Sequence, residues 1–161
     1  MRKRYLAALA AAVLAAAAVL SATAATARAD MSLSLGQPQL QSGVLIVVPA
    51  TVSCSPFDPS LTMASSSLFV SVEQAVNKTT IAHGSGFTPT MGDNPILYPC
   101  DDLPHAISVN VFADTGGAPF RKGQAVFSAG ASAFAGTPCG PGCFFNTVSQ
   151  RADLVTTLKL K

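Results

Sequence analysis

Apolar and polar residues alternate with a period of two through most of the sequence after residue 30. The clearest run is 44–54, where every even position is apolar and the odd positions become polar toward the end. Such alternation is typical of a β-strand with one buried face. Four later runs repeat it, and Gln74 is expected at the border between core and solvent. The residues predicted to be buried are Val44, Ile46, Val48, Ala50, Val52 and Cys54; Leu68, Val70, Val72 and Val76; Ile107, Val109, Val111 and Ala113; Ala125, Phe127, Ala129 and Ala131; and Ala152, Leu154, Thr156, Leu158 and Leu160.

Weaker alternation at 32–40 and 80–87 brings the expected number of strands to about seven. Turn-forming residues separate the runs, the last of them at 136–142, and no segment after residue 30 keeps a helical period over ten residues. Short alternating strands with turns between them predict an all-β fold. We expect an antiparallel immunoglobulin-like β-sandwich, with a small barrel as the alternative.

The first 29 residues have the three parts of an export signal. Residues 1–4 are basic, 5–20 are uncharged and rich in Ala, Leu and Val, and 27–29 read Ala-Arg-Ala. This order predicts cleavage after Ala29, a secreted product and a single domain at 30–161. The alternative is an uncleaved anchor, because 5–27 are uncharged. No cysteine follows the signal closely and no apolar tail ends the chain, so we expect no stable membrane anchor.

Removing the signal changes the charge of the protein. Residues 1–29 contain four of the ten basic residues and none of the eight acidic ones. Residues 30–161 therefore have six basic and eight acidic residues, a net charge of −2. A weakly acidic domain does not bind nucleic acid by bulk charge, so no nucleic-acid partner is expected. No segment after the signal is long and apolar enough for a channel.

Export makes disulfides the default state of the four cysteines. Three pairings are possible, and we favour Cys54–Cys100 with Cys139–Cys143, because Gly-Pro-Gly between the last two brings them together. The long bridge closes a loop worth on the order of 4 kcal/mol, against about 2 kcal/mol for the short one. A metal site with the two histidines is the alternative, but the paired C-x2-C spacing of zinc modules is missing.

Several short motifs carry a resemblance to a known group. They are the strand end at 52–54, the strand 70–74, the Cys-Asp turn and histidine at 100–105, and the Pro-Phe run at 119–126. Together they resemble small secreted actinobacterial proteins with an immunoglobulin-like domain of unknown function. Asp102 stands where that group more often has Gly, and the chain has no Trp. A weaker likeness, in size and in the short two-cysteine loop, is to the neocarzinostatin class, and it assigns no ligand-binding residue here.

The histidines do not form a recognisable catalytic motif in the sequence. His83, the carboxylates Asp101 and Asp102 and a serine could imitate a Ser-His-Asp triad, but no G-x-S-x-G elbow is present. His105 is expected to be half-exposed at a strand start. Glu73 and Asp114 are too isolated for the paired carboxylates of a glycosidase. The sequence therefore predicts a protein that is not an enzyme and needs no cofactor.

One group of oxygen ligands could hold a weak Ca²⁺ ion. Asp93, Asn94, Asp101 and Asp102 would converge if the long disulfide drew their turns together. No D-x-D-x-D-G loop is present, so the favoured interpretation is solvated turn residues and no metal site.

The aromatic residues near the short cysteine loop are the strongest candidate for a binding surface. Phe134, Phe144 and Phe145 lie within twelve positions around that loop. Two of them could simply extend the buried faces of the last strands. Alternatively, they form an apolar patch on a stiffened hairpin that binds an unknown protein or a small apolar ligand. The preferred function is a secreted non-enzymatic binding module; an inhibitor of extracellular proteases is the alternative, and a small-ligand carrier the third.

Overall fold

The computed structural model describes residues 31–88, 96–141 and 143–161, so the predicted signal peptide lies outside the described residues. Every regular element in these ranges is a strand, every strand pair is antiparallel, and the described residues include no helix. The all-β prediction is confirmed, with eight strands rather than about seven. The strands are β1 (Met31–Leu35), β2 (Gln39–Ser42), β3 (Leu45–Cys54), β4 (Thr62–Ala75), β5 (Ile81–Thr88), β6 (His105–Ala113), β7 (Gly123–Gly140) and β8 (Cys143–Leu160).

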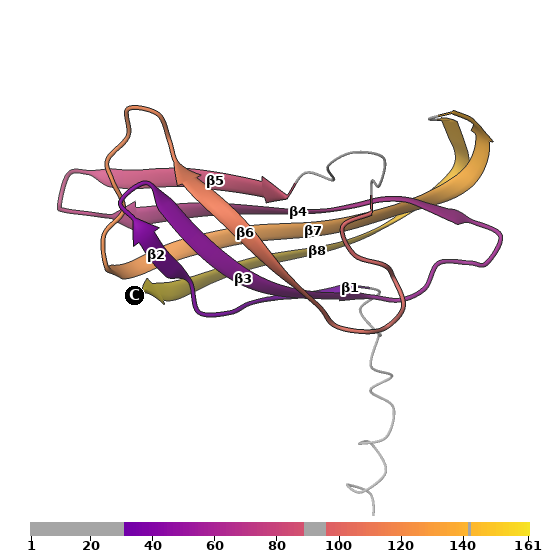
Figure 1. Cartoon of the computed structure of the whole chain (residues 1–161), viewed down its shortest axis with the longest axis horizontal. Coiled ribbons are helices and arrows are strands. Elements are labelled where there is room, and N and C mark those ends of the chain that lie inside the picture. Colours follow the sequence, from indigo (N-terminus) through magenta and orange to yellow (C-terminus); the bar gives the residue numbers. More distant parts are fainter. Residues whose placement is uncertain (1–30, 89–95, 142) are drawn as a thin grey trace, which may run out of the picture.

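Hydrogen bonds join the strands in the order β1-β3-β6-β5-β4-β7-β8, and β2 also pairs with β3. The sheet folds over, so that β3 and β6 run diagonally across β4, β7 and β8 (Figure 1). The two ends of the sheet meet: the Leu40 amide donates to the carbonyl of Lys161 at 3.1 Å, and the Gln37 side chain donates to the carbonyl of Lys159.

The core lies between the two halves of the folded sheet. One buried cluster takes residues from every strand except β2, and on β3, β4, β6 and β7 they alternate along the strand, as the period of two predicts. On β7 the buried residues are mostly alanines around Phe127, so the two halves need little space between them. The best-buried side chains are Ile46, Val48 and Val52 of β3, Leu68, Val70 and Val72 of β4, Val109 and Val111 of β6, and Phe127 of β7.

Several predicted positions need correction. Six residues expected in the core are only partly buried: Ile107, Ala113, Ala152, Leu154, Thr156 and Leu158. Val44 is 60% exposed because it lies in the turn before β3, and Val76 is only partly buried because β4 ends at Ala75. Gln74 is buried rather than at the border. Its amide nitrogen donates to the carbonyl of Arg121 at 2.7 Å, and its amide oxygen accepts from the Arg121 amide at 2.8 Å. These bonds offset the cost of burying the polar group.

The ends of two predicted elements also differ. The run 32–40 divides into β1 and β2 around 36–38, where the Gly36 amide donates to the carbonyl of Pro49. The predicted turn at 136–142 is mostly strand, because β7 continues to Gly140 and pairs with β8 up to Cys143.

Two glycines allow the sheet to fold at the junction of β5 and β6. These strands pair only at Gly84 with Ala113 and at Ser85 with Phe112. A Cβ atom at Gly84 would lie 2.4 Å from the carbonyl oxygen of Phe112, and one at Gly86 would lie 2.3 Å from that of Asn110. The close approach of the two backbones therefore requires residues without side chains.

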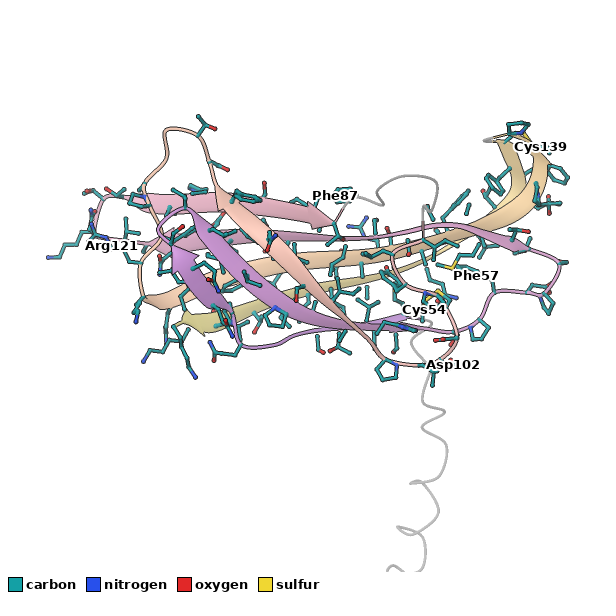
Figure 2. The ribbon with its side chains drawn as sticks, viewed as in Figure 1. Cys54, Phe57, Phe87, Asp102, Arg121 and Cys139 are labelled. Atoms are coloured by element: carbon teal, nitrogen blue, oxygen red, sulfur yellow. A yellow bond between two sulfur atoms is a disulfide. The ribbon has the colours of Figure 1, made fainter. Side chains whose placement is uncertain are left out.

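Both predicted disulfides are confirmed. Cys54 at the end of β3 is bonded to Cys100, with 4.7 Å between their Cα atoms, and Cys139 is bonded to Cys143. Figure 2 shows Cys139 at the tip of the β7–β8 hairpin, well away from Cys54. The long bridge fixes the loop before β6 against the core, whereas the short one closes the hairpin.

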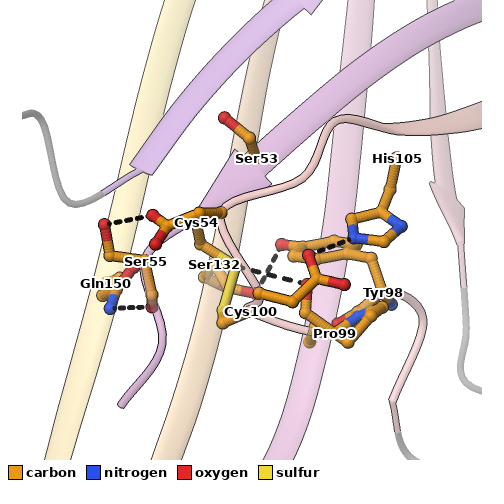
Figure 3. The surroundings of a disulfide bond; sticks show 12 residues. Ser53, Cys54, Ser55, Tyr98, Pro99, Cys100, His105, Ser132 and Gln150 are labelled. Carbon is orange, nitrogen blue, oxygen red and sulfur yellow. Dashed lines mark hydrogen bonds and ion pairs between the residues drawn. A yellow bond between two sulfur atoms is a disulfide. The ribbon is translucent and has the colours of Figure 1, made fainter.

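That loop carries Tyr98, whose side chain is buried between the two halves of the sheet. Its hydroxyl donates toward the carbonyl oxygens of Ser67 on β4, at 3.0 Å, and Ser132 on β7, at 2.8 Å (Figure 3). The Ser66 hydroxyl oxygen accepts from the amide of Tyr98 and donates to its carbonyl. The loop is thus fixed by a covalent bond at Cys100 and by a polar network two residues earlier.

Titration of Tyr98 is expected to destabilise the fold at high pH. Burial raises the pKa of its hydroxyl from 10.0 to about 12, an effect larger than that of the two carbonyl acceptors. The folded pKa exceeds the unfolded one, so the free energy of unfolding does not depend on this hydroxyl below pH 10. Between pH 10 and about 12 the free energy of unfolding falls, by up to about 1.4 kcal/mol per pH unit.

Tyr98 is the only tyrosine after residue 29, and the chain has no Trp. In protein that lacks residues 1–29, phenolate absorbance therefore reports on this one group, and urea titrations at each pH give the free energy of unfolding. The Tyr98→Phe variant should lack this loss of stability. A phenolate midpoint near pH 10 in the folded protein would contradict the expectation.

Candidate functional site

The β7–β8 hairpin extends beyond the rest of the sheet. Pairing between β4 and β7 ends at Thr62 with Gly136, after which β7 and β8 pair only with each other. Figure 1 shows this end curling away from the other strands. We call residues 134–141 and 143–149 the hairpin arm. The disulfide Cys139–Cys143 lies at its tip.

The three phenylalanines of the predicted binding surface all lie on the hairpin arm. Phe134 and Phe144 are half-buried against each other, with ring centroids 6.0 Å apart and ring planes at 86°. Phe134 alternates with the buried Ala133 and Ala135, so it lies on the outer face of β7 and does not extend the core. Phe145 is 49% exposed. The arm therefore presents aromatic surface to solvent.

A second candidate is a hollow on the outer face of β4, β7 and β8, which we call the outer-face pocket. Register places Phe69, Gly130 and Asp153 in one row across these strands. Because Gly130 has no side chain, the row has a gap between Phe69 and Asp153. The cavity measures about 290 Å³ and is lined by Ser67, Phe69, Ser128, Ala129, Gly130, Ala131, Ser132, Arg151 and Asp153.

Hydrogen bonds join lining side chains on two sides of the outer-face pocket. The hydroxyl oxygens of Ser67 and Ser132 are 2.9 Å apart. Arg151 donates from Nε to Oδ2 of Asp153 at 2.9 Å and from Nη2 to Oδ1 at 3.0 Å. This hydrogen bonding raises the pKa of the Arg151 guanidinium. The pair contributes no net charge to the pocket.

In the described part of the chain, the two histidines lie on different strands and pair with different carboxylates. His83 lies opposite Glu73 on the outer face, with 3.7 Å between Nδ1 and Oε1. His105 lies on another strand, and its Nε2 is 2.8 Å from Oδ1 of Asp101. Hydrogen bonding from His105, followed by that from the Leu103 amide, lowers the pKa of Asp101. Within the described ranges no serine hydroxyl bonds to either histidine, so the Ser-His-Asp alternative finds no support.

The described part of the predicted cation cluster is occupied by internal contacts. Asp102 accepts a hydrogen bond from the Ser55 hydroxyl at 3.0 Å, and Asp101 accepts from His105 (Figure 3). Asp93 and Asn94 lie outside the described residues. Among the residues that the structure covers, no three His, Cys, Asp or Glu side chains are grouped to hold a metal ion. Asp114 lies in an exposed turn, where its carbonyl accepts from the Gly117 amide.

Comparisons of the chain with protein-family models, with curated proteins and with solved structures gave no match. In the described ranges, no helix has the length and apolar character needed to cross a membrane.

The sequence contained a signal for the outer-face pocket. Ser128, Gly130 and Ser132 occupy the polar positions of one alternating run, and this pattern puts three small residues on one face of the strand. What the sequence does not give is the register that places Phe69 and Asp153 on either side of Gly130.

Proposed function

We propose that the protein is a secreted, non-enzymatic binding module with an immunoglobulin-like sandwich fold. The observation that carries this proposal is the hairpin arm, which is braced by Cys139–Cys143 and exposes half of Phe145. A braced loop loses little conformational entropy on binding, and aromatic side chains supply most of the binding energy at many interfaces. The occupant is an unidentified protein or a small apolar ligand.

The strand order supports the immunoglobulin-like assignment. In such sandwiches strands A, B and E share one sheet and strands C, F and G the other. If β1, β3 and β6 are strands A, B and E, then β4, β7 and β8 are strands C, F and G, and each set is contiguous in the observed order. Strand β5, beside β4, then takes the place of the extra strand C′ of variable domains.

The two disulfides support export, because such bonds persist in oxidising compartments. They agree with the predicted signal peptide at 1–29. The separation of the two histidine–carboxylate pairs supports a function without catalysis, since within the described ranges neither histidine is hydrogen-bonded to a serine hydroxyl.

Capture experiments with matched variants test the hairpin arm. The immobilised protein is exposed to culture medium and cell-envelope extract of its host, and captured proteins are identified by mass spectrometry. We expect Phe145→Ser to lose the partner. Phe112→Ser is the control, because Phe112 is exposed to a similar extent on β6, away from the arm. Equal capture by both variants would exclude the arm as the binding surface.

A second candidate function is inhibition of extracellular proteases. It is favoured by the exposure of the disulfide-closed tip, where Pro138, Cys139, Gly140 and Pro141 all lie in solvent. Incubation with a panel of secreted proteases should then give inhibition at micromolar concentration, and its absence would reject this candidate.

A further inference from the structure

We propose that the outer-face pocket binds a ring of a neutral oligosaccharide. This site lies on the sheet face and does not depend on the hairpin arm. Gly130 carries no side chain, so it leaves a gap in the row between Phe69 and Asp153. Neighbouring strands are about 4.8 Å apart, so the walls formed by Phe69 and Asp153 stand roughly 10 Å apart at the backbone. The Asp153 carboxylate reaches toward Gly130, with Oδ1 3.0 Å from the position a Cβ atom would take, so the opening is narrower than the backbone spacing. The cavity of about 290 Å³ that remains is the space offered to one six-membered ring.

One wall of the gap is aromatic and the other is hydrogen-bonding, and a sugar ring has surfaces that suit both. Phe69 is 44% exposed and lines the cavity, so it offers aromatic surface to the C–H groups of the sugar. Opposite it, Asp153 accepts and Arg151 donates hydrogen bonds. In the neighbouring row, which also holds Arg151, the Ser67 and Ser132 hydroxyls can do both. Sugar hydroxyls are likewise donors and acceptors, so this mixed lining can satisfy them.

The charge of the pocket selects a neutral ligand. Arg151 is already held by Asp153 through parallel hydrogen bonds. The two charges neutralise each other, so the pocket has no net charge that would favour an anionic or a cationic ligand. A purely apolar ligand would take water from both charged groups and give nothing in return.

The pocket wall is preorganised from the core side. Tyr98 donates toward the carbonyl oxygens of Ser67 and Ser132, and the hydroxyls of the same two serines bond to each other above the sheet. These residues therefore keep their positions before a ligand arrives, which reduces the entropy lost on binding.

The same row supplies a contact for a second sugar. Register places Phe87 of β5 beside Phe69, and Phe87 is 56% exposed. Two exposed aromatic side chains followed by a gap suit a chain of rings better than a single one, and this is why an oligosaccharide is the proposed ligand.

Nuclear magnetic resonance titration tests the proposal. The purified, isotope-labelled protein with both disulfides formed is titrated with cellohexaose, maltohexaose, chitohexaose and mannohexaose. We expect at least one of them to shift the amide signals of Phe69, Gly130 and Arg151, with a Kd on the order of 1 mM. If none of the four shifts these signals, the proposal is wrong.

Variants separate the pocket from general effects. Phe69→Ala should raise the Kd about tenfold or more. Gly130→Ala should abolish binding without unfolding the protein, because the new Cβ meets only the exposed carboxylate of Asp153, at 3.0 Å. Phe112→Ala should bind as the parent does. Circular dichroism checks that each variant is folded, and loss of binding in Phe112→Ala would contradict the assignment.

Two further probes test the ligand class. Adenosine presents a flat aromatic ring, and a hexamer of galacturonate presents sugar rings with negative charge. Tighter binding of either probe than of every neutral oligosaccharide would overturn the proposal. Phe145→Ser should leave sugar binding unchanged, so failure of the hairpin-arm proposal and failure of this one give different results.

Discussion

Replacing Cys54 and Cys100 together by alanine is expected to lower the free energy of unfolding by about 4 kcal/mol. The bridge spans 46 positions of sequence, so the reduced chain has far more unfolded conformations than the bridged one. It also fixes the loop that carries Tyr98 into the core. Urea unfolding followed by far-ultraviolet circular dichroism measures the change.

The matched control is replacement of Cys139 and Cys143 by alanine. This bridge spans only 4 positions, so its removal should cost no more than about 2 kcal/mol. The hairpin tip also lies beyond the last pairing of β4 with β7. Equal losses for the two double variants would mean that loop length does not determine their contributions.

The Gly86→Ala variant is expected to lose about 3 kcal/mol of stability, the upper range for overpacking a well-filled site. The added Cβ would lie 2.3 Å from the carbonyl oxygen of Asn110 and 2.9 Å from Cγ1 of Val109. Because the first of these atoms belongs to the backbone, β5 and β6 must separate where the sheet folds. Thermal and urea unfolding measure the loss.

Ser85→Ala is the control for that variant. Ser85 lies between Gly84 and Gly86 on the same strand, and its side chain points to solvent. Its replacement should change stability by less than about 0.5 kcal/mol. If Gly86→Ala were as mild, the close contact of β5 and β6 would not be needed for folding.

Period-two alternation predicted most of the strands because one face of each is buried. On β3 the expected positions from Ile46 to Cys54 are all buried. Alternation failed at Val44, where a turn residue happens to be apolar. It also missed the length of β7, since the glycines and Pro138 there suggested a loop. In a two-stranded hairpin no third strand needs the missing Pro138 amide, so the strand can continue through it.

The candidate sites show what alternation leaves out. A sequence pattern assigns residues to a face, but cross-strand register decides which of them are neighbours. Register brings Phe69, Gly130 and Asp153 into one row, although they are far apart in sequence. It also places His83 beside Glu73 rather than beside Asp101 or Asp102. The disulfide pairing, in contrast, was accessible because the Gly-Pro-Gly segment favours closure of the short loop.

The hydrogen bond from Leu40 to Lys161 has a consequence for the protein in concentrated solution. Free amide and carbonyl groups along an edge strand are a template on which another molecule can add its own strand, the first step of aggregation and of domain swapping. The last residue of this chain is already bonded to the start of β2, so this corner of the sheet is protected from exchange between neighbouring molecules.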